Sequence, residues 1–201
     1  DIYIAAGVYD NPVERRNILY INKGLDAKTK VPVFVDEAQA YGLAEETSTH
    51  MAAFFDYDND GDLDLYVAHC RQSSSSYTDL RRKDRLFVNN GSNVYTEAAT
   101  AHGIEPNGFK QTWTASFGDL DNDGDLDLVV TNHGETREIF INDRSGNYSL
   151  LNNSGFSTSF DPLESVLEDF DNDGYLDILI TGTQWLVYRN NGDLTFTSTT
   201  G

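Results

Sequence analysis

An acidic nine-residue loop occurs three times in this chain, and it limits the possible folds more than any other feature. Each copy has aspartate at positions 1, 3, 5 and 9 and glycine at position 6. Carboxylates at alternate positions of a curled loop can converge on one centre, and glycine permits the sharp reversal this requires. Without a cation, carboxylates so close would repel one another. The copies, named loop 1, loop 2 and loop 3, are Asp56–Asp64, Asp119–Asp127 and Asp169–Asp177.

The loops begin like the calcium loop of an EF-hand but do not continue like one. An EF-hand needs glutamate at position 12 and a helix on each side. Position 12 is Val67, Val130 and Ile180. Each loop runs into a short segment rich in β-branched residues, which is typical of a buried strand. We therefore predict calcium loops that lead into β-strands, and the EF-hand and dockerin interpretations both fail.

The loops are part of a longer sequence repeat. The apolar segment after each loop also opens the chain, so it starts at Asp1, Asp64, Asp127 and Asp177. Each copy of this segment is followed, in the same order, by a second segment with a hairpin turn, a third segment and a glycine–apolar pair. A fourth segment then leads into the next loop. The turns are expected near Gly24, Gly91, Arg144 and Gly192, and the pairs are Gly42-Leu43, Gly103-Ile104 and Gly155-Phe156.

Four short strands per repeat with tight turns are typical of a β-propeller blade. We predict an all-β fold built from propeller-type blades of four antiparallel strands, with three to four blades present as a partial propeller. The chain is expected to be a single repeat array, with approximate repeats at residues 1–63, 64–126 and 127–176 and an incomplete one at 177–201. The segment at residues 69–84, with its run of serines, is expected to be a surface excursion.

Charge and cysteine content narrow the possible partners and the compartment. The chain has 33 acidic and 14 basic residues and a formal net charge of −19, which argues against nucleic acid or an anionic membrane as partner. No apolar stretch approaches the length needed to span a bilayer. The single cysteine, Cys70, rules out an intramolecular disulfide and is expected to be a small buried or half-buried side chain and not a nucleophile. Flexible calcium sites are filled where Ca²⁺ is near millimolar, so we expect a secreted or cell-surface protein.

The acidic loop, the Leu86-Phe-Val-Asn-Asn-Gly91 hairpin and the closing Gly42-Leu43 pair together resemble the FG-GAP/VCBS repeat family, the integrin-α-like calcium-binding β-propeller repeats. The chain is particularly similar to the type that accompanies ASPIC/UnbV modules. The resemblance implies about three Ca²⁺ sites, ligated by carboxylates at positions 1, 3, 5 and 9 and by the backbone carbonyl of position 7. These residues are Asp56, Asp58, Asp60, Asp62 and Asp64; Asp119, Asp121, Asp123, Asp125 and Asp127; and Asp169, Asp171, Asp173, Tyr175 and Asp177.

Asp1 departs from this pattern, because it matches position 9 but no acidic loop precedes it. We therefore expect a fragment of a larger chain, or a piece that must complete itself. The edges at Asp1–Ala6 and near Thr195–Gly201 would be unpaired, and proteins rarely leave such edges exposed. Head-to-tail docking of the two ends into a ring or filament is one way to cover them.

The remaining chemistry-bearing residues form no catalytic pattern. The four histidines, His50, His69, His102 and His133, share no repeat position and no metal-ligand spacing, and are expected to have structural or surface roles. Most regularly placed acids are committed to the loops, which leaves no carboxylate pair for glycosidic hydrolysis. We expect a scaffold for structure, adhesion or assembly, and not an enzyme. The alternative is a glycan-binding or accessory module of a carbohydrate-active extracellular protein, in which Trp113 and Trp185 could form a platform.

Overall fold

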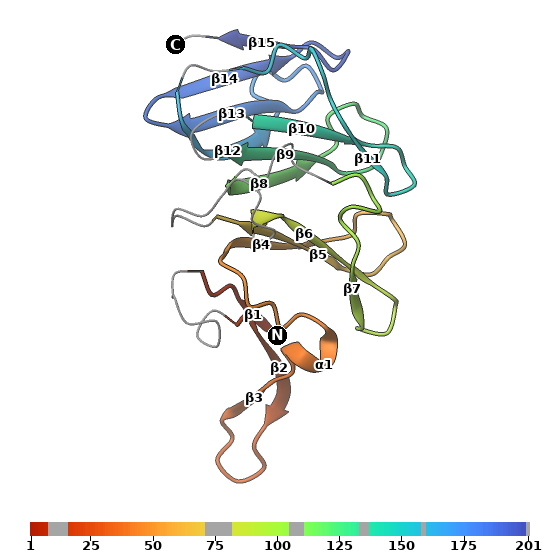
Figure 1. Cartoon of the computed structure of the whole chain (residues 1–201), viewed down its shortest axis with the longest axis vertical. Helices are drawn as coiled ribbons and strands as arrows, with labels where there is room; N and C mark the ends of the chain where they lie inside the picture. The colour runs from red at the N-terminus through yellow and green to blue at the C-terminus, as the bar shows by residue number, and fades with distance from the viewer. Residues whose placement is uncertain (8–15, 71–81, 105–110, 133–136, 158–159, 200–201) are drawn as a thin grey trace.

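The protein is a row of four β-sheets stacked along its long axis (Figure 1). The computed structural model describes residues 1–7, 16–70, 82–104, 111–132, 137–157 and 160–199. These residues form fifteen strands and one short helix, α1 (Ala38–Tyr41). Within these ranges, no helix is both long and apolar enough to cross a membrane. The surface excursion expected at residues 69–84 lies largely outside the described residues, as does His133.

Each sheet follows chain order, and every neighbouring pair of strands is antiparallel. Sheet 1 has three strands and sheets 2, 3 and 4 have four each. Sheet 1 contains β1 (Ile2–Ile4), β2 (Ile18–Leu25) and β3 (Pro32–Asp36). Sheet 2 contains β4 (Thr49–Phe55), β5 (Asp64–His69), β6 (Arg85–Asn89) and β7 (Tyr95–Glu97). Sheet 3 contains β8 (Thr112–Gly118), β9 (Asp127–Asn132), β10 (Arg137–Asn142) and β11 (Tyr148–Leu150). Sheet 4 contains β12 (Pro162–Glu168), β13 (Asp177–Gly182), β14 (Trp185–Asn190) and β15 (Phe196–Thr199).

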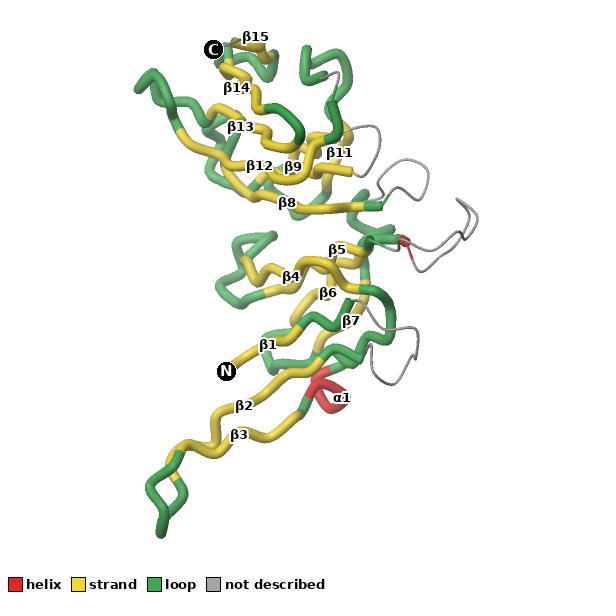
Figure 2. The backbone as a smooth tube through the Cα atoms, turned by 90° about the vertical axis from the view of Figure 1, so that its left-hand side faces the viewer, coloured by secondary structure: helices red, strands yellow, loops and turns green. Residues whose placement is uncertain are grey.

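The prediction of an all-β fold made of propeller-type blades is confirmed. Each acidic loop joins the first and second strands of a sheet and leads into a strand, not a helix, as expected. The sheets lie in an open row with sheets 1 and 4 at its two ends, and the described residues do not close it into a ring (Figures 1 and 2). The predicted repeats begin at the strand after each loop. The last strand of each predicted repeat is therefore the first strand of the following sheet.

The core lies between the sheets, because each sheet is apolar on both faces. Side chains alternate across a strand, so neighbouring residues of one strand enter different clusters. Leu65 and Val67 of β5 pack with Leu19 of sheet 1, whereas Tyr66 and Ala68 pack against sheet 3. A third cluster joins sheets 3 and 4. We call the face of a sheet toward the preceding sheet its leading face, and the opposite face its trailing face.

The hairpin of sheet 1 differs from the prediction. A turn was expected at Gly24, but β2 continues to Leu25, and the pairing with β3 shifts register between Asn22 and Leu25. The chain reverses later, where the Asp26 amide donates to the Val31 carbonyl at 2.9 Å. The Asp26 carboxylate accepts the amides of Lys28 and Thr29, which stabilises this later turn. The predicted turn position was therefore wrong for this sheet.

The glycine–apolar pairs join each sheet to the next. Ile104 is fully buried, and Gly103 has a φ of 75°. A Cβ at Gly103 would collide with the carbonyl oxygen of Tyr148, in the outer strand of sheet 3. The Tyr148 amide donates to the His102 carbonyl at 2.7 Å. Gly42 and Gly155 approach Tyr95 and Phe196 of the following sheets in the same way.

Candidate metal centres

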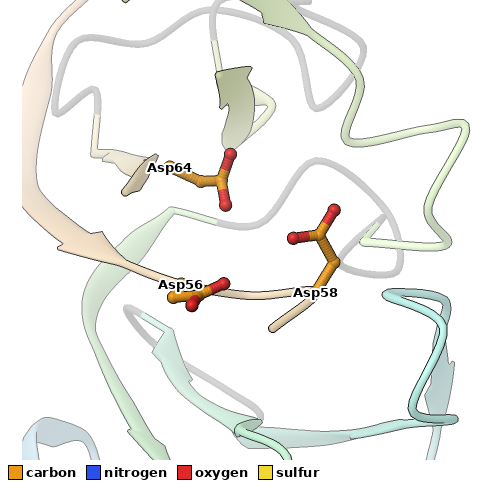
Figure 3. Close-up of side chains that lie close together, drawn as sticks. All are labelled: Asp56, Asp58 and Asp64. Carbon is orange, nitrogen blue, oxygen red and sulfur yellow. The ribbon is translucent and has the colours of Figure 1, made fainter. Parts of the chain in front are cut away.

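Each acidic loop brings three carboxylates together, those at positions 1, 3 and 9. In each group the candidate ligand oxygens all lie within 4.8 Å of one another. Figure 3 shows the group of loop 1, in which the carboxylates of Asp56, Asp58 and Asp64 surround a common space. The other two groups are Asp119, Asp121 and Asp127, and Asp169, Asp171 and Asp177. Carboxylate oxygens are ligands that hard cations such as Ca²⁺ prefer, so each group could hold a metal ion.

The backbone of the loop is curled by its own first aspartate. In loop 2 the Asp119 carboxylate accepts the amides of Asp123 and Gly124, both at 3.0 Å, and loops 1 and 3 repeat this pair of bonds. Gly124 has a φ of 99°, a region that glycine enters without strain. Asn122 at position 4 also has a positive φ, as do Asn59 and Asn172. The asparagine at position 4 of every loop was a signal that the sequence reasoning did not use.

The buried aspartate at position 9 anchors the loop to its sheet. Asp127 accepts the Leu120 amide at 2.8 Å with one oxygen and the Asn142 amide at 2.9 Å with the other. Asp64 and Asp177 make the equivalent bonds in loops 1 and 3. This carboxylate therefore joins position 2 of the loop to the end of the third strand of the sheet.

Positions 5 and 7 lie outside the converging groups. The position-5 carboxylates turn toward the amide of position 7, as Asp60 does toward Asp62 at 3.0 Å. Arginines contact two of the loops: Arg144 pairs with Asp123 at position 5 at 2.9 Å. Arg189 pairs with Asp173 at position 5 at 3.4 Å and also with Asp171 at position 3 at 2.5 Å. At position 7, Asp125 accepts the Arg144 amide, and the Tyr175 ring lies beside Gly192 of the adjoining hairpin. Position-5 ligation therefore stays a prediction, and so does position-7 ligation by its carbonyl.

The electrostatics of the loops fit a cation. Burial raises the pKa of Asp64 and of Asp125 to about 6 and that of Asp127 to about 7, and neighbouring carboxylates add to each shift. The Oδ1 atom of Asp58 is buried and has no hydrogen-bond partner among the described residues. A buried oxygen without a partner is costly, and a bound cation would satisfy it. The donor set thus fits a hard divalent ion.

In sheets 3 and 4, an asparagine at the end of the third strand forms a bond to the loop of the preceding sheet. Asn142 of sheet 3 donates its side-chain N–H to the carbonyl of Tyr57, in loop 1 of sheet 2, at 2.8 Å. Asn190 of sheet 4 donates in the same way to Leu120 of loop 2 at 2.8 Å. The amide of Asn122 also reaches from loop 2 to the carbonyl of Gly174 in loop 3 at 2.9 Å. The repeated asparagine had been interpreted only as a turn residue, and these contacts across sheets were missed.

The histidines of the described residues have structural surroundings, as expected. His69 is buried and contacts Thr47 at 2.5 Å, and burial lowers its pKa to about 4. His102 lies between Tyr57 and the Gly146 carbonyl. The His50 ring packs edge-on against Trp113, with ring centroids 4.8 Å apart, whereas Trp185 is exposed.

Cys70 is buried, as predicted, and burial raises the pKa of its thiol to about 11, which makes it a poor nucleophile. The sequence reasoning missed a buried polar cluster nearby, because no repeat or motif marks it. Asp84 accepts the hydroxyls of Tyr66 and Thr112, both at 2.6 Å, and the His69 amide at 2.8 Å. It joins sheets 2 and 3 at the ends of the strands.

Stacked four-stranded sheets with an acidic loop between the first two strands define a β-propeller-type repeat array. The FG-GAP-like repeat matches this chain twice, at residues 75–130 and 119–180. These matches span more than half of the chain, which therefore belongs to the FG-GAP-like repeat family, as its motifs indicated. The comparison with curated proteins gave no match.

Proposed function

We propose that this chain is a secreted, calcium-stabilised blade array that serves as a structural, adhesion or assembly scaffold and not as a catalyst. The observation that carries the proposal is the double role of each loop. One end holds converging carboxylates, and the carbonyl at position 2 of loops 1 and 2 accepts a bond from the next sheet. Ca²⁺ bound at positions 1, 3 and 9 would therefore stabilise a sheet and its junction with the next one.

Calcium would supply positive charge that allows the buried aspartates to stay ionised in the folded state. Ion binding is then coupled to folding, because the unfolded chain does not hold the carboxylates together. Extracellular calcium, near millimolar, suits flexible sites of this kind. This supports placing the array outside the cell, where a stiff row of sheets can present surfaces to proteins or glycans.

The experiment is a thermal melt in Ca²⁺ and in EGTA, combined with calorimetric titration. We expect about three sites. A ligand at a hundred times its Kd stabilises by about 2.7 kcal/mol per site, or roughly 8 kcal/mol for three sites. The melting temperature should therefore fall in EGTA by about 20 °C and recover in Ca²⁺. Mg²⁺, which demands stricter octahedral geometry, serves as the control and should recover less. An unchanged melt in EGTA would refute the proposal.

Glycan binding is the second candidate, and one cavity favours it. A cavity of about 780 Å³ lies between sheets 1 and 2, where β4 faces the three-stranded sheet. Its lining combines the rings of Tyr3, Tyr41, Phe54 and Tyr95 with the polar groups of Asp62 and Asn93, a mixture suited to sugar rings and hydroxyls. Glycan-array binding in saturating Ca²⁺ that is lost in Tyr41→Ala would support this candidate. Binding unaffected by that substitution would count against this cavity.

A further inference from the structure

The three acidic loops share one shape but differ in charge. Loop 1 and loop 2 each contain five aspartates, whereas loop 3 contains four, because tyrosine replaces aspartate at its position 7. One arginine pairs with loop 2 and another with loop 3. When each arginine is counted with its loop, the net charge is −5 for loop 1, −4 for loop 2 and −3 for loop 3. Because the charge of the ligands tunes calcium affinity, attraction for the ion should fall from loop 1 to loop 3.

The two arginines differ in the aspartates that they contact. Arg144, from the hairpin of sheet 3, pairs with Asp123 at position 5, which lies outside the converging group. The Nε atom of Arg189 lies 2.5 Å from the Oδ2 atom of Asp171, which belongs to the converging group of loop 3. A second nitrogen of Arg189 lies 3.4 Å from the carboxylate of Asp173. One guanidinium therefore bridges positions 3 and 5 of loop 3 and holds an oxygen of a candidate ligand.

The place of Arg189 in its strand explains why this bridge belongs to loop 3. Arg189 directly precedes Asn190 in β14, and the residues that precede the equivalent asparagines are Val88 in sheet 2 and Ile141 in sheet 3. All three residues pair with the outer strand of their sheet in the same register. Val88 and Ile141 pack on the trailing faces, in the clusters that join their sheets to the following ones. These apolar side chains offer no charge to loops 1 and 2.

We propose that Arg189 is an internal counter-ion of loop 3 and makes it the last of the three loops to bind calcium. This inference rests on the proposed function, because it takes the loops as calcium sites. The guanidinium offsets the repulsion between Asp171 and Asp173, so loop 3 depends less on a cation to keep its curled shape. The same positive charge repels an approaching Ca²⁺ and competes for the position-3 carboxylate. Calcium then fills the array in steps, with loop 1 responding at lower concentrations than loop 3.

A calcium titration that resolves each loop tests the proposal. The position-6 glycines Gly61, Gly124 and Gly174 each donate an amide hydrogen bond to the first aspartate of their loop. Their amide signals in two-dimensional NMR spectra therefore report the three loops separately. In the wild type, the midpoint of the Gly174 signal should lie at a Ca²⁺ concentration about tenfold above that of Gly61. In Arg189→Gln the Gly174 midpoint should fall by about tenfold, while the other two midpoints stay in place.

Two further variants separate the charge of Arg189 from its bulk and from the net charge of the chain. Arg144→Gln removes the same charge from a residue that contacts no converging group, so it should leave the Gly174 midpoint unchanged. Arg189→Lys keeps the positive charge but loses the planar fork, so its Gly174 midpoint should stay closer to that of the wild type than to that of Arg189→Gln. Circular dichroism should show that each variant is folded.

Amide hydrogen exchange of the wild type in EGTA provides a measurement that needs no variant. The Asp173 and Gly174 amides of loop 3 should exchange more slowly than the equivalent Asp60 and Gly61 amides of loop 1, because loop 3 has its counter-ion in place. Faster exchange in loop 3 than in loop 1 would contradict the proposal.

The proposal would also be overturned if a folded Arg189→Gln left the Gly174 midpoint unchanged or raised it. A wild-type loop 3 that fills before loop 1 would have the same consequence. These results leave the calcium proposal standing, since the loops would still bind the ion. The calcium proposal itself fails if none of the three glycine signals responds to Ca²⁺.

Discussion

Sheets 1 and 3 share a bond between an aspartate and an asparagine but differ in its surroundings. In sheet 3, Asp127 joins the Leu120 amide of loop 2 to the Asn142 amide of the hairpin. In sheet 1, Asp1 accepts the equivalent Asn22 amide at 2.7 Å in an exposed position. Asn22 is exposed and Asn142 is buried. The comparison teaches that the aspartate–asparagine bond forms in exposed as well as in buried surroundings, and that in sheet 3 the same aspartate also holds loop 2.

Replacing the position-9 aspartate should give the largest difference in stability between the matched changes in sheets 1 and 3. Asp127→Ala leaves two amides near a buried site without an acceptor, each costing about 1–3 kcal/mol, and it also removes a candidate ligand. We expect a loss of on the order of 4 kcal/mol in the free energy of unfolding in Ca²⁺. Asp1→Ala, the matched change in sheet 1, should cost under about 1 kcal/mol because its bond is exposed. Urea denaturation measures both, and equal losses would show that the loop adds nothing to this position.

The asparagine that links neighbouring sheets should give the next largest difference. Asn142→Ala removes the donor to the Tyr57 carbonyl, which becomes an unpaired group in a buried junction. We expect a loss of about 2 kcal/mol, and a similar loss for Asn190→Ala. Asn22→Ala should change stability by less than about 0.5 kcal/mol, as exposed substitutions usually do. A large effect of Asn22→Ala on the monomer would contradict the comparison.

Acid should weaken calcium binding over the range in which the loop aspartates titrate. Burial raises the pKa of Asp64 to about 6 and that of Asp127 to about 7 in the folded chain. The metal-free folded state therefore holds protons that the unfolded state has released, and its stability falls as pH rises from about 4 to about 7. Calcium must displace these protons.

We therefore expect the difference in melting temperature between Ca²⁺ and EGTA to shrink as pH falls from about 8 to about 5. Asp84, whose pKa burial also raises to about 6, and His69, whose pKa is lowered, affect both melts alike and cancel in the difference. A difference that is constant across this range would show that the aspartates do not exchange protons for the ion.

The smallest effect is expected at position 7, where loop 3 has tyrosine and the other loops have aspartate. If this position contributes its carbonyl, Tyr175→Asp should leave the number of calcium sites unchanged. The affinity of loop 3 should change by less than about tenfold, or 1.4 kcal/mol, and calorimetric titration measures it. An added carboxylate that raised affinity a hundredfold would instead indicate direct ligation by the side chain.

The strands, loops and blade architecture could be predicted because each depends on local spacing. Aspartates at alternate positions, glycine at position 6 and a β-branched run identify a loop and the strand after it, and recurrence identifies the repeat. The contacts of Asn142 with Tyr57 and of Asp84 with Thr112 could not be predicted, because they join different sheets and depend on how the sheets stack. The later turn of sheet 1 was missed because Gly24 matches the turn glycine of the other sheets, while Asp26 stabilises a turn further on.

The bonds between each glycine–apolar linker and the next outer strand also give the array a direction of growth. β11 and β15 are short, and the amides of Tyr148 and Phe196 bond to carbonyls in the linker of the preceding sheet. An outer strand can therefore pair with this linker only after the preceding sheet has formed. A chain that emerges N-terminus first can complete one sheet at a time, each on a template already in place, with pairing partners that stay near in sequence.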